Sequence, residues 1–265
     1  RDRSPSRGLG DVYKRQDPEN RSLYSNDLGT RISAMHSIAA SGDIKAIPAL
    51  IERLNVDPQW ERLMSIYTLG ALGHQAVDPL VSVIKDSVLG KDDTITKIWK
   101  EGSFSMNDAA HALAAIGAAS LDSLIELLNH PNEWVKVNAA YSLGEMDSTA
   151  AKAVPALTHC LDDPSHCVVR TATDALSTIQ HHSETFIPSL ERLLKERRIE
   201  WQNIVARNWS PNDEVRVNAT MLFTRLGKKA SSSERLLLDK LADPNGHVSA
   251  FALEALRRIG THLAM

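Results

Sequence analysis

Residues 159–167, HCLDDPSHC, concentrate the side chains of this sequence that are best suited to chemistry. Two His-Cys pairs lie seven positions apart, with two aspartates between them. Imidazole, thiolate and carboxylate groups are the usual zinc ligands in proteins. A metal site or a redox-active thiol pair is therefore the first function to test, and the test depends on the elements that carry these residues.

Four ungapped segments of the chain share one pattern. Each begins with Pro and has Val four residues later, Ala eight later and a large apolar residue twelve later. Offsets of four place these side chains on one face of a helix, and proline suits the first helical turn because it needs no amide donor there. The segments are PNEWVKVNAAYSL, PSHCVVRTATDAL, PNDEVRVNATMLF and PNGHVSAFALEAL, which begin at Pro131, Pro164, Pro211 and Pro244.

A small residue followed four positions later by a large apolar one marks seven such first helices. The small side chain allows a neighbouring helix to approach closely. Successive large residues are 31, 44, 30, 33, 47 and 33 positions apart, so two of the intervals hold insertions. The pairs are Ala34/Ile38, Ser65/Leu69, Ala109/Leu113, Ala139/Leu143, Ala172/Leu176, Ala219/Phe223 and Ala252/Leu256.

A second apolar stretch with helical spacing follows the first helices. Pro48, Pro155 and Pro188 lie where these second helices are expected to begin. Glycines near the ends of the first helices suit left-handed caps: Gly70, Gly73, Gly117, Gly144 and Gly227. No stretch alternates as a strand would, so the sequence predicts an all-α protein, an α-solenoid of about seven two-helix repeats.

The string DP…VR…A…AL…AVPAL…LDD resembles HEAT repeats, in particular the short HEAT-like repeats named after phycobilisome lyases. VPALTHCLDDPSHCVVRTATDAL is the closest stretch, and the resemblance covers roughly residues 28–263. It implies a right-handed superhelix of the armadillo-like class. It implies little about function, because repeats of this kind occur in proteins with unrelated roles.

Residues 1–27 fit no repeat. The first sixteen, RDRSPSRGLGDVYKRQ, are polar, rich in Arg, Gly and Ser, and resemble translated adapter sequence, so we expect residues 1–27 to be a disordered or artefactual segment. Residues 28–265 are expected to form the solenoid, with insertions near 88–107 and 196–210.

The repeat alignment gives HCLDDPSHC a structural role. The stretch is expected to end one second helix, turn at Asp162-Asp163-Pro164 and begin the next first helix. Neighbouring residues on a helix diverge by about 100°, so each His-Cys pair offers only one convenient ligand. We therefore predict free, buried or half-buried thiols at Cys160 and Cys167, with no bound metal and no cofactor.

Two other features of the repeats carry expectations. His36 and His111 share an outward position with Tyr67, Tyr141, Asp174, Met221 and Glu254, which predicts a polar, solvated stripe. Four cations stand seven residues before the large apolar position and are expected to join repeats by pairing with acids near the preceding turn. The cations are Arg31, Arg62, Lys136 and Arg216, and the acids are Asp57, Asp162, Asp163, Asp213 and Asp243.

Composition and motifs exclude several activities. Deoxyhypusine hydroxylases build an iron site from His-Glu dipeptides, and none of the ten histidines here precedes Glu. A net charge of -3 and mixed charges on the second helices argue against nucleic acid. The apolar runs are too short for a membrane span, and two cysteines without a signal sequence suggest a cytoplasmic protein.

The two insertions contain three of the five tryptophans, interleaved with basic residues. Trp and Arg are enriched at binding hot spots, and solenoid insertions often line a binding face. We therefore predict a non-enzymatic scaffold for a protein partner, with Trp201 or Trp209 at least partly exposed. The candidate partner-binding residues are Trp99, Arg197, Arg198, Trp201, Arg207 and Trp209.

Two alternatives remain open. The insertion tryptophans could instead fill a widened gap in the core. By analogy of fold, the chain could be a bilin lyase-like subunit that handles a tetrapyrrole or modifies a protein partner.

Overall fold

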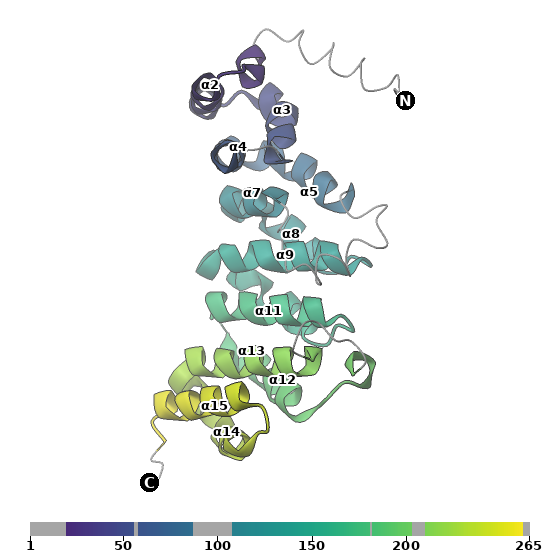
Figure 1. The fold of residues 1–265 in the computed structure, drawn as a ribbon, viewed down its shortest axis with the longest axis vertical. Coiled ribbons are helices and arrows are strands. Elements are labelled where there is room, and N and C mark those ends of the chain that lie inside the picture. The colour runs from purple at the N-terminus through teal and green to yellow at the C-terminus, as the bar shows by residue number, and fades with distance from the viewer. Residues whose placement is uncertain (1–19, 56–57, 87–107, 181, 203–209, 262–265) are drawn as a thin grey trace.

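The computed structural model describes residues 20–55, 58–86, 108–180, 182–202 and 210–261, and it shows an elongated stack of paired helices (Figure 1). Across these ranges the first helices lie side by side as one layer. They are α2 (Leu28–Ser41), α4 (Gln59–Leu72), α7 (Asp108–Ile116), α9 (Glu133–Glu145), α11 (His166–Ile179), α13 (Pro211–Leu226) and α15 (Gly246–Ile259).

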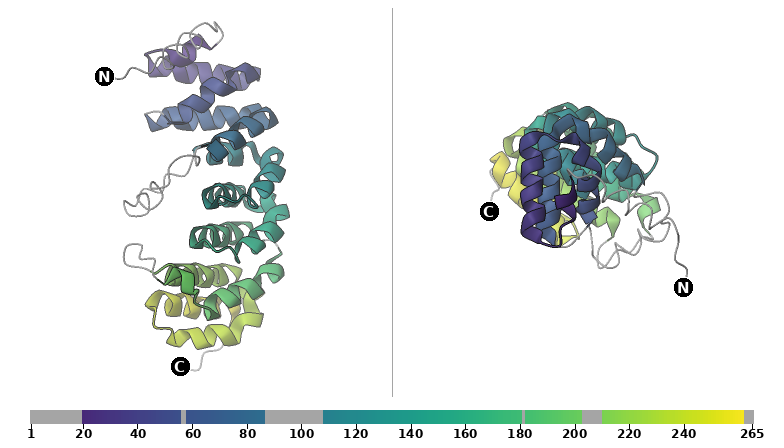
Figure 2. Two further views of the ribbon diagram at one scale, coloured as in Figure 1. Left: turned by 90° about the vertical axis from the view of Figure 1, so that its right-hand side faces the viewer. Right: turned by 90° about the horizontal axis from the view of Figure 1, so that it is seen from above.

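The second helices form the other layer, which Figure 2 shows edge-on. They are α3 (Ile47–Glu52), α5 (Val77–Asp86), α8 (Leu121–Leu127), α10 (Val154–Cys160), α12 (Ser183–Lys195) and α14 (Glu234–Asp239). Most follow a 3-10 turn that leaves the first helix, such as Gly73–Ala76 and Asp147–Ala153. The described ranges contain no strand, and the predicted α-solenoid is confirmed.

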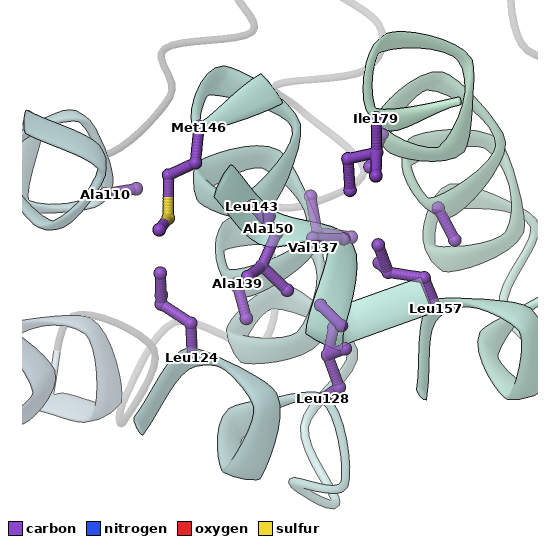
Figure 3. Close-up of a cluster of buried hydrophobic side chains, with 14 of the residues drawn as sticks. Ala110, Leu124, Leu128, Val137, Ala139, Leu143, Met146, Ala150, Leu157 and Ile179 are labelled. Atoms are coloured by element: carbon purple, nitrogen blue, oxygen red, sulfur yellow. The ribbon is translucent and has the colours of Figure 1, made fainter. Parts of the chain in front are cut away.

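The core runs between the two layers through the whole stack. Ala139, Ala172, Ala219 and Ala252 are fully buried, so the predicted repeat alignment is correct at these positions. Figure 3 shows Leu143 of α9 among buried side chains from the helices around it, which include Ala110, Leu124, Leu157 and Ile179. Each repeat therefore buries its apolar face against its neighbours, as expected for a solenoid.

Two of the predicted cap glycines have a different role. Gly73, Gly117 and Gly227 adopt positive φ, as predicted. Gly144 instead lies within α9, where a Cβ atom would come within 3.1 Å of the Ala175 Cα atom on α11. Gly70 of α4 has the same relation to Ala115, with a Cβ–Cβ distance of 3.0 Å. At these two positions glycine allows neighbouring first helices to come into contact, and it does not act as a helix C-cap.

The repeat prolines begin first helices less directly than predicted. Pro131 and Pro244 precede the N-cap residues Asn132 and Asn245, whose side chains accept hydrogen bonds from backbone amides of the first turn. Only Pro211, behind the N-cap Ser210, is the first helical residue among the four aligned copies. Of the second-helix prolines, Pro188 lies inside α12 rather than at its start.

The packed stack includes residues before residue 28. Arg21–Tyr24 forms a 3-10 turn, and Leu23 is fully buried against the first repeat. The Asp27 carboxylate then caps α2 by accepting a hydrogen bond of 2.7 Å from the Thr30 amide. Residues 20–27 therefore belong to the packed stack, which corrects the expectation of disorder for this part of the segment.

One stretch, Asp108–Leu127, is long and apolar enough to resemble a membrane span by composition. In the structure it comprises α7, the 3-10 turn Gly117–Ser120 and α8. It is therefore the helix pair of one repeat, folded back on itself within the stack.

Ion pairs from the first helices connect most neighbouring repeats. The Arg31 Nη2 atom lies 2.8 Å from Glu61, and the Arg62 Nε atom lies 3.1 Å from Asp108. Further along the stack, Lys136 pairs with Asp163, Arg170 with Glu214 and Arg216 with Asp243. The cations do link repeats, but their predicted partners are only partly correct. Arg31 and Arg62 pair with acids of the following repeat that were not predicted. Lys136 pairs with a predicted acid in the following turn, and only Arg216 also pairs with one before it, Asp213. Asp57 lies outside the described residues, and Asp162 pairs instead with Arg192 of α12.

The pair between Arg216 and Asp243 is the most buried of these links. Their side chains are 4% and 3% exposed, and Asp213 accepts a second hydrogen bond of 3.0 Å from the guanidinium. A buried cation that loses its main acceptor retains the full desolvation penalty, so loss of one partner costs far more than at the surface.

We therefore expect Asp243→Ala to destabilise the chain by about 3 kcal/mol. The matched control is Asp162→Ala, which removes an exposed link between repeats and should cost less than about 1 kcal/mol. Urea unfolding monitored by circular dichroism measures both. Equal losses in the two variants would contradict the assigned role of burial.

Candidate functional site

The HCLDDPSHC stretch is placed as predicted, at the junction between two repeats. Cys160 ends α10, and His166 begins α11. Cys160 and Cys167 are separate, buried thiols, 4% and 3% exposed. Burial raises the pKa of Cys160 to about 11 and that of Cys167 to about 12, so both are neutral thiols near pH 7.

Residues 198–201, which follow α12, cover this junction, and we call them the covering segment. The Arg198 Nη2 atom donates a hydrogen bond of 2.8 Å to the Leu161 carbonyl, and Nη1 donates to the carbonyl of Asp163. The Trp201 indole Nε1 donates a hydrogen bond of 2.7 Å to the Pro164 carbonyl. Three carbonyls of the turn are thus satisfied by residues about 35 positions later in the chain.

The covering segment is itself fixed from both sides. The Arg198 guanidinium lies over the Trp201 ring at 4.5 Å, and His166 meets the same ring edge-on at 6.1 Å. Asn212 accepts a hydrogen bond of 2.8 Å from the Arg198 amide and donates one of 3.0 Å to its carbonyl. The turn is therefore a structural joint between repeats.

The described residues bring no three His, Cys, Asp or Glu side chains together as a metal site would require. A shallow cleft of 260 Å³ beside the turn is lined by His130, His159 and Lys136, among others. Its Lys136 is already paired with Asp163. That the protein binds no metal stays a prediction.

The insertion residues lie in several different environments. Trp201 is only 2% exposed, so its expected exposure is wrong, and the alternative role as core filler holds for it. Arg198 is directed inward, as described above. Arg197 is exposed, with its Nη2 atom 3.2 Å from Asp213. Trp99, Arg207 and Trp209 lie outside the described residues, and their binding role stays a prediction.

Large exposed apolar side chains gather instead on α4. Trp60, Leu63 and Tyr67 are 70%, 43% and 61% exposed. Their spacing of three and four residues places them on one side of the helix, opposite Leu69 and Leu72 in the core. Aromatic side chains of this size are usually buried in a soluble protein, so a row of them is a candidate interaction surface.

The row continues onto the neighbouring first helices. Tyr67, His111 and Tyr141 occupy the same position in successive repeats, on α4, α7 and α9. The His111 and Tyr141 rings meet edge to face, with centroids 5.0 Å apart and planes at 81°. We call Trp60, Leu63, Tyr67, His111 and Tyr141 together the aromatic face.

The predicted polar stripe is therefore only partly correct. The stripe residue is Asp174 on α11 and Glu254 on α15, but it is Met221 on α13. Asp174 is exposed on one side, and desolvation by its neighbours raises the pKa of its carboxyl to about 6. Arg170 of α11 also pairs with Glu214 of α13 at 2.9 Å, so the stripe is aromatic from α4 to α9 and carries more charge beyond α9.

Around the aromatic face the charges are already engaged. Glu61 is 1% exposed and receives both Arg31 and Arg53, at 2.8 and 3.3 Å. Arg62 is paired with Asp108. Burial, with a smaller contribution from a hydrogen bond to Glu145, raises the pKa of Tyr141, so its phenol stays protonated. The described part of the face offers rings and hydrogen-bond donors, and the arginines around it are paired with carboxylates.

A family model for HEAT repeats matches residues 121–203, which run from α8 to the covering segment. These residues are similar to HEAT repeats, and the helix pairs before and after them have the same arrangement. The matched region contains the HCLDDPSHC joint and Trp201, whereas α4 and most of the aromatic face lie outside it.

Several solved structures are similar to this chain in fold. Designed armadillo repeat proteins for modular peptide recognition align at 21% identity with a TM-score of 0.44, covering 80% of this chain and 99% of theirs. Human deoxyhypusine hydroxylase in complex with glycerol aligns at 19% identity with a TM-score of 0.42, and the alignment covers 96% of this chain and 99% of the hydroxylase. The complex of CpcE and CpcF of phycocyanin lyase from Nostoc aligns at 18% identity with a TM-score of 0.33, and the alignment covers 93% of this chain and 87% of the lyase chain. None of the curated proteins matches the sequence. Likeness at this level says nothing about function.

The raised pKa values predict unreactive thiols. At pH 8 iodoacetamide should label neither cysteine of the folded chain and both in urea, because only about one thiol in a thousand is ionised at a pKa of about 11. Labelling should begin only as the pH approaches that value. Mass spectrometry reads the labels, and metal analysis should find no stoichiometric zinc. One zinc per chain that is lost in Cys167→Ser would contradict the structural role of the joint.

The burial of Trp201 predicts a large loss of stability on truncation. Trp201→Ala removes the indole and its bond to Pro164, so the cost should be about 3 kcal/mol, or a Tm lower by about 6–12 °C. Ile199→Ala, two residues earlier and 76% exposed, is the matched control and should leave Tm nearly unchanged. A stable Trp201→Ala variant would return this residue to the candidate binding surface.

Proposed function

We propose that this protein is a non-enzymatic scaffold that binds a protein partner through the aromatic face. The observation that carries the proposal is the exposure of Trp60 and Tyr67, at 70% and 61%, on one side of α4. Indole and phenol rings are among the side chains that contribute most to binding when a partner removes them from water.

The backbone beneath these rings is held rigidly, which favours binding. Gly70 brings α4 into close contact with α7, and Arg31 connects Glu61 at the start of α4 to the preceding repeat. Thr68 adds a hydrogen bond of 3.4 Å to the Met35 carbonyl on α2. A preorganised surface loses little conformational entropy on association.

The described residues support binding more than catalysis. Both thiols are buried and neutral near pH 7, and no described His, Cys, Asp or Glu cluster of three or more forms a metal site. The arginines at the face are paired with carboxylates, which favours a protein partner over nucleic acid. A cytoplasmic location, where the two thiols stay reduced, is part of this proposal.

Photo-crosslinking from within the face tests the proposal directly. A benzophenone amino acid placed at Leu63 should capture a partner in lysate of the source organism. Trp60→Ala and Tyr67→Ala should each abolish capture while Tm changes little, because both side chains are mostly exposed.

The matched control places the same crosslinker at Leu253 of α15, which is 49% exposed and lies at the far end of the stack. Equal capture from both positions, or a Tm lower by several degrees in the alanine variants, would contradict the proposal. Absorbance of the purified protein above the aromatic band would point instead to a bound tetrapyrrole.

A further inference from the structure

The aromatic face also indicates what kind of protein segment it binds; this inference rests on the proposed function and narrows it. The rings follow two directions. Trp60, Leu63 and Tyr67 run along α4, whereas Tyr67, His111 and Tyr141 cross three neighbouring helices. A ligand that uses the second row must run along the stack, across the helices.

The available area is too small for a second copy of this chain. Two aromatic side chains of about 150–250 Å² each, exposed at 70% and 61%, and a half-exposed Leu63 provide on the order of 300–400 Å². A stable protein dimer buries about 800 Å² on each partner. The face therefore fits a short peptide segment better than a dimer interface.

The polar tips of the rings favour a ligand with unsatisfied carbonyl groups. The Trp60 indole N–H and the Tyr67 hydroxyl are donors on mostly exposed side chains. A bound helix satisfies its own carbonyls, so it would make little use of such donors. A polyproline II segment has no internal hydrogen bonds and presents its carbonyls to the surface that binds it.

The spacing of the row matches the same conformation. Neighbouring packed helices lie about 8–10 Å apart. A polyproline II helix repeats every three residues with a rise of about 3.1 Å, so every third side chain returns to one side after about 9 Å. One turn of ligand per repeat would place a proline ring against Tyr67 and the next against the edge-to-face pair of His111 and Tyr141.

The charges are compatible with an uncharged ligand. Arg62 is paired with Asp108, and Glu145 borders the face beside Tyr141. A carboxylate there disfavours an acidic peptide, and no unpaired cation from the described residues lies at the face to attract one. From these observations we infer that the aromatic face binds a proline-rich segment in the polyproline II conformation.

Calorimetric titration of the full chain with a blocked decaproline peptide, acetylated and amidated so that it carries no charge, tests this inference. The folded chain should bind the peptide, and Tyr67→Ala and Trp60→Ala should each weaken binding at least about tenfold, with Tm nearly unchanged. Leu253→Ala, also an exposed apolar residue, should bind as the unmodified chain does. A blocked alanine-rich helical peptide of equal length should not bind.

The two levels of the proposal fail in different ways. If decaproline does not bind at millimolar concentration while crosslinking from Leu63 still depends on Tyr67, the polyproline II inference is wrong and the binding surface stands. If the helical peptide binds and decaproline does not, the ligand is a helix. If neither peptide binding nor crosslinking depends on Tyr67, the proposal that the aromatic face binds a partner is wrong.

Discussion

The close approach of neighbouring first helices is the constraint on which the rest of this structure depends. Each first helix carries one small residue at its centre, and Ala139, Ala172, Ala219 and Ala252 are fully buried there. Beyond the small position of α9, Gly144 approaches the backbone of α11 so closely that a Cβ atom would lie 3.1 Å from it. Because no repeat can bury its apolar face alone, this contact fixes the stacking of the whole chain.

That stacking leaves two kinds of position for variation. Side chains at the edges of the first helices link repeats through ion pairs, from Arg31–Glu61 to the buried Arg216–Asp243 pair. Side chains that point away from the second helices are less constrained by packing than the core, and there the chain changes from aromatic at Tyr67 to charged at Asp174. Outward side chains can thus differ from repeat to repeat while the backbone stays the same, which gives each part of the solenoid surface its own chemistry.

The periodic features were predictable from the sequence because they depend on contacts between adjacent repeats. The buried alanines, the helix pairs and the cation positions all repeat with the chain. The role of Trp201 was not predictable, because its partner Pro164 lies 37 residues earlier and no periodic signal connects them. The outward position of Tyr67 was correctly predicted, but the row with Trp60 and Leu63 was not, because those residues have no counterpart in the repeat pattern.

The position of the binding surface depends on which tryptophan is available to a partner. Acrylamide quenching of two single-tryptophan variants, in which Trp60 or Trp201 is retained and the other four are replaced by Phe, measures this directly. Trp60, at 70% exposure, should emit at long wavelength and be quenched several times more strongly than Trp201, at 2%. Strong quenching of Trp201 with protection of Trp60 would contradict the assignment of the aromatic face and return the binding surface to the insertion.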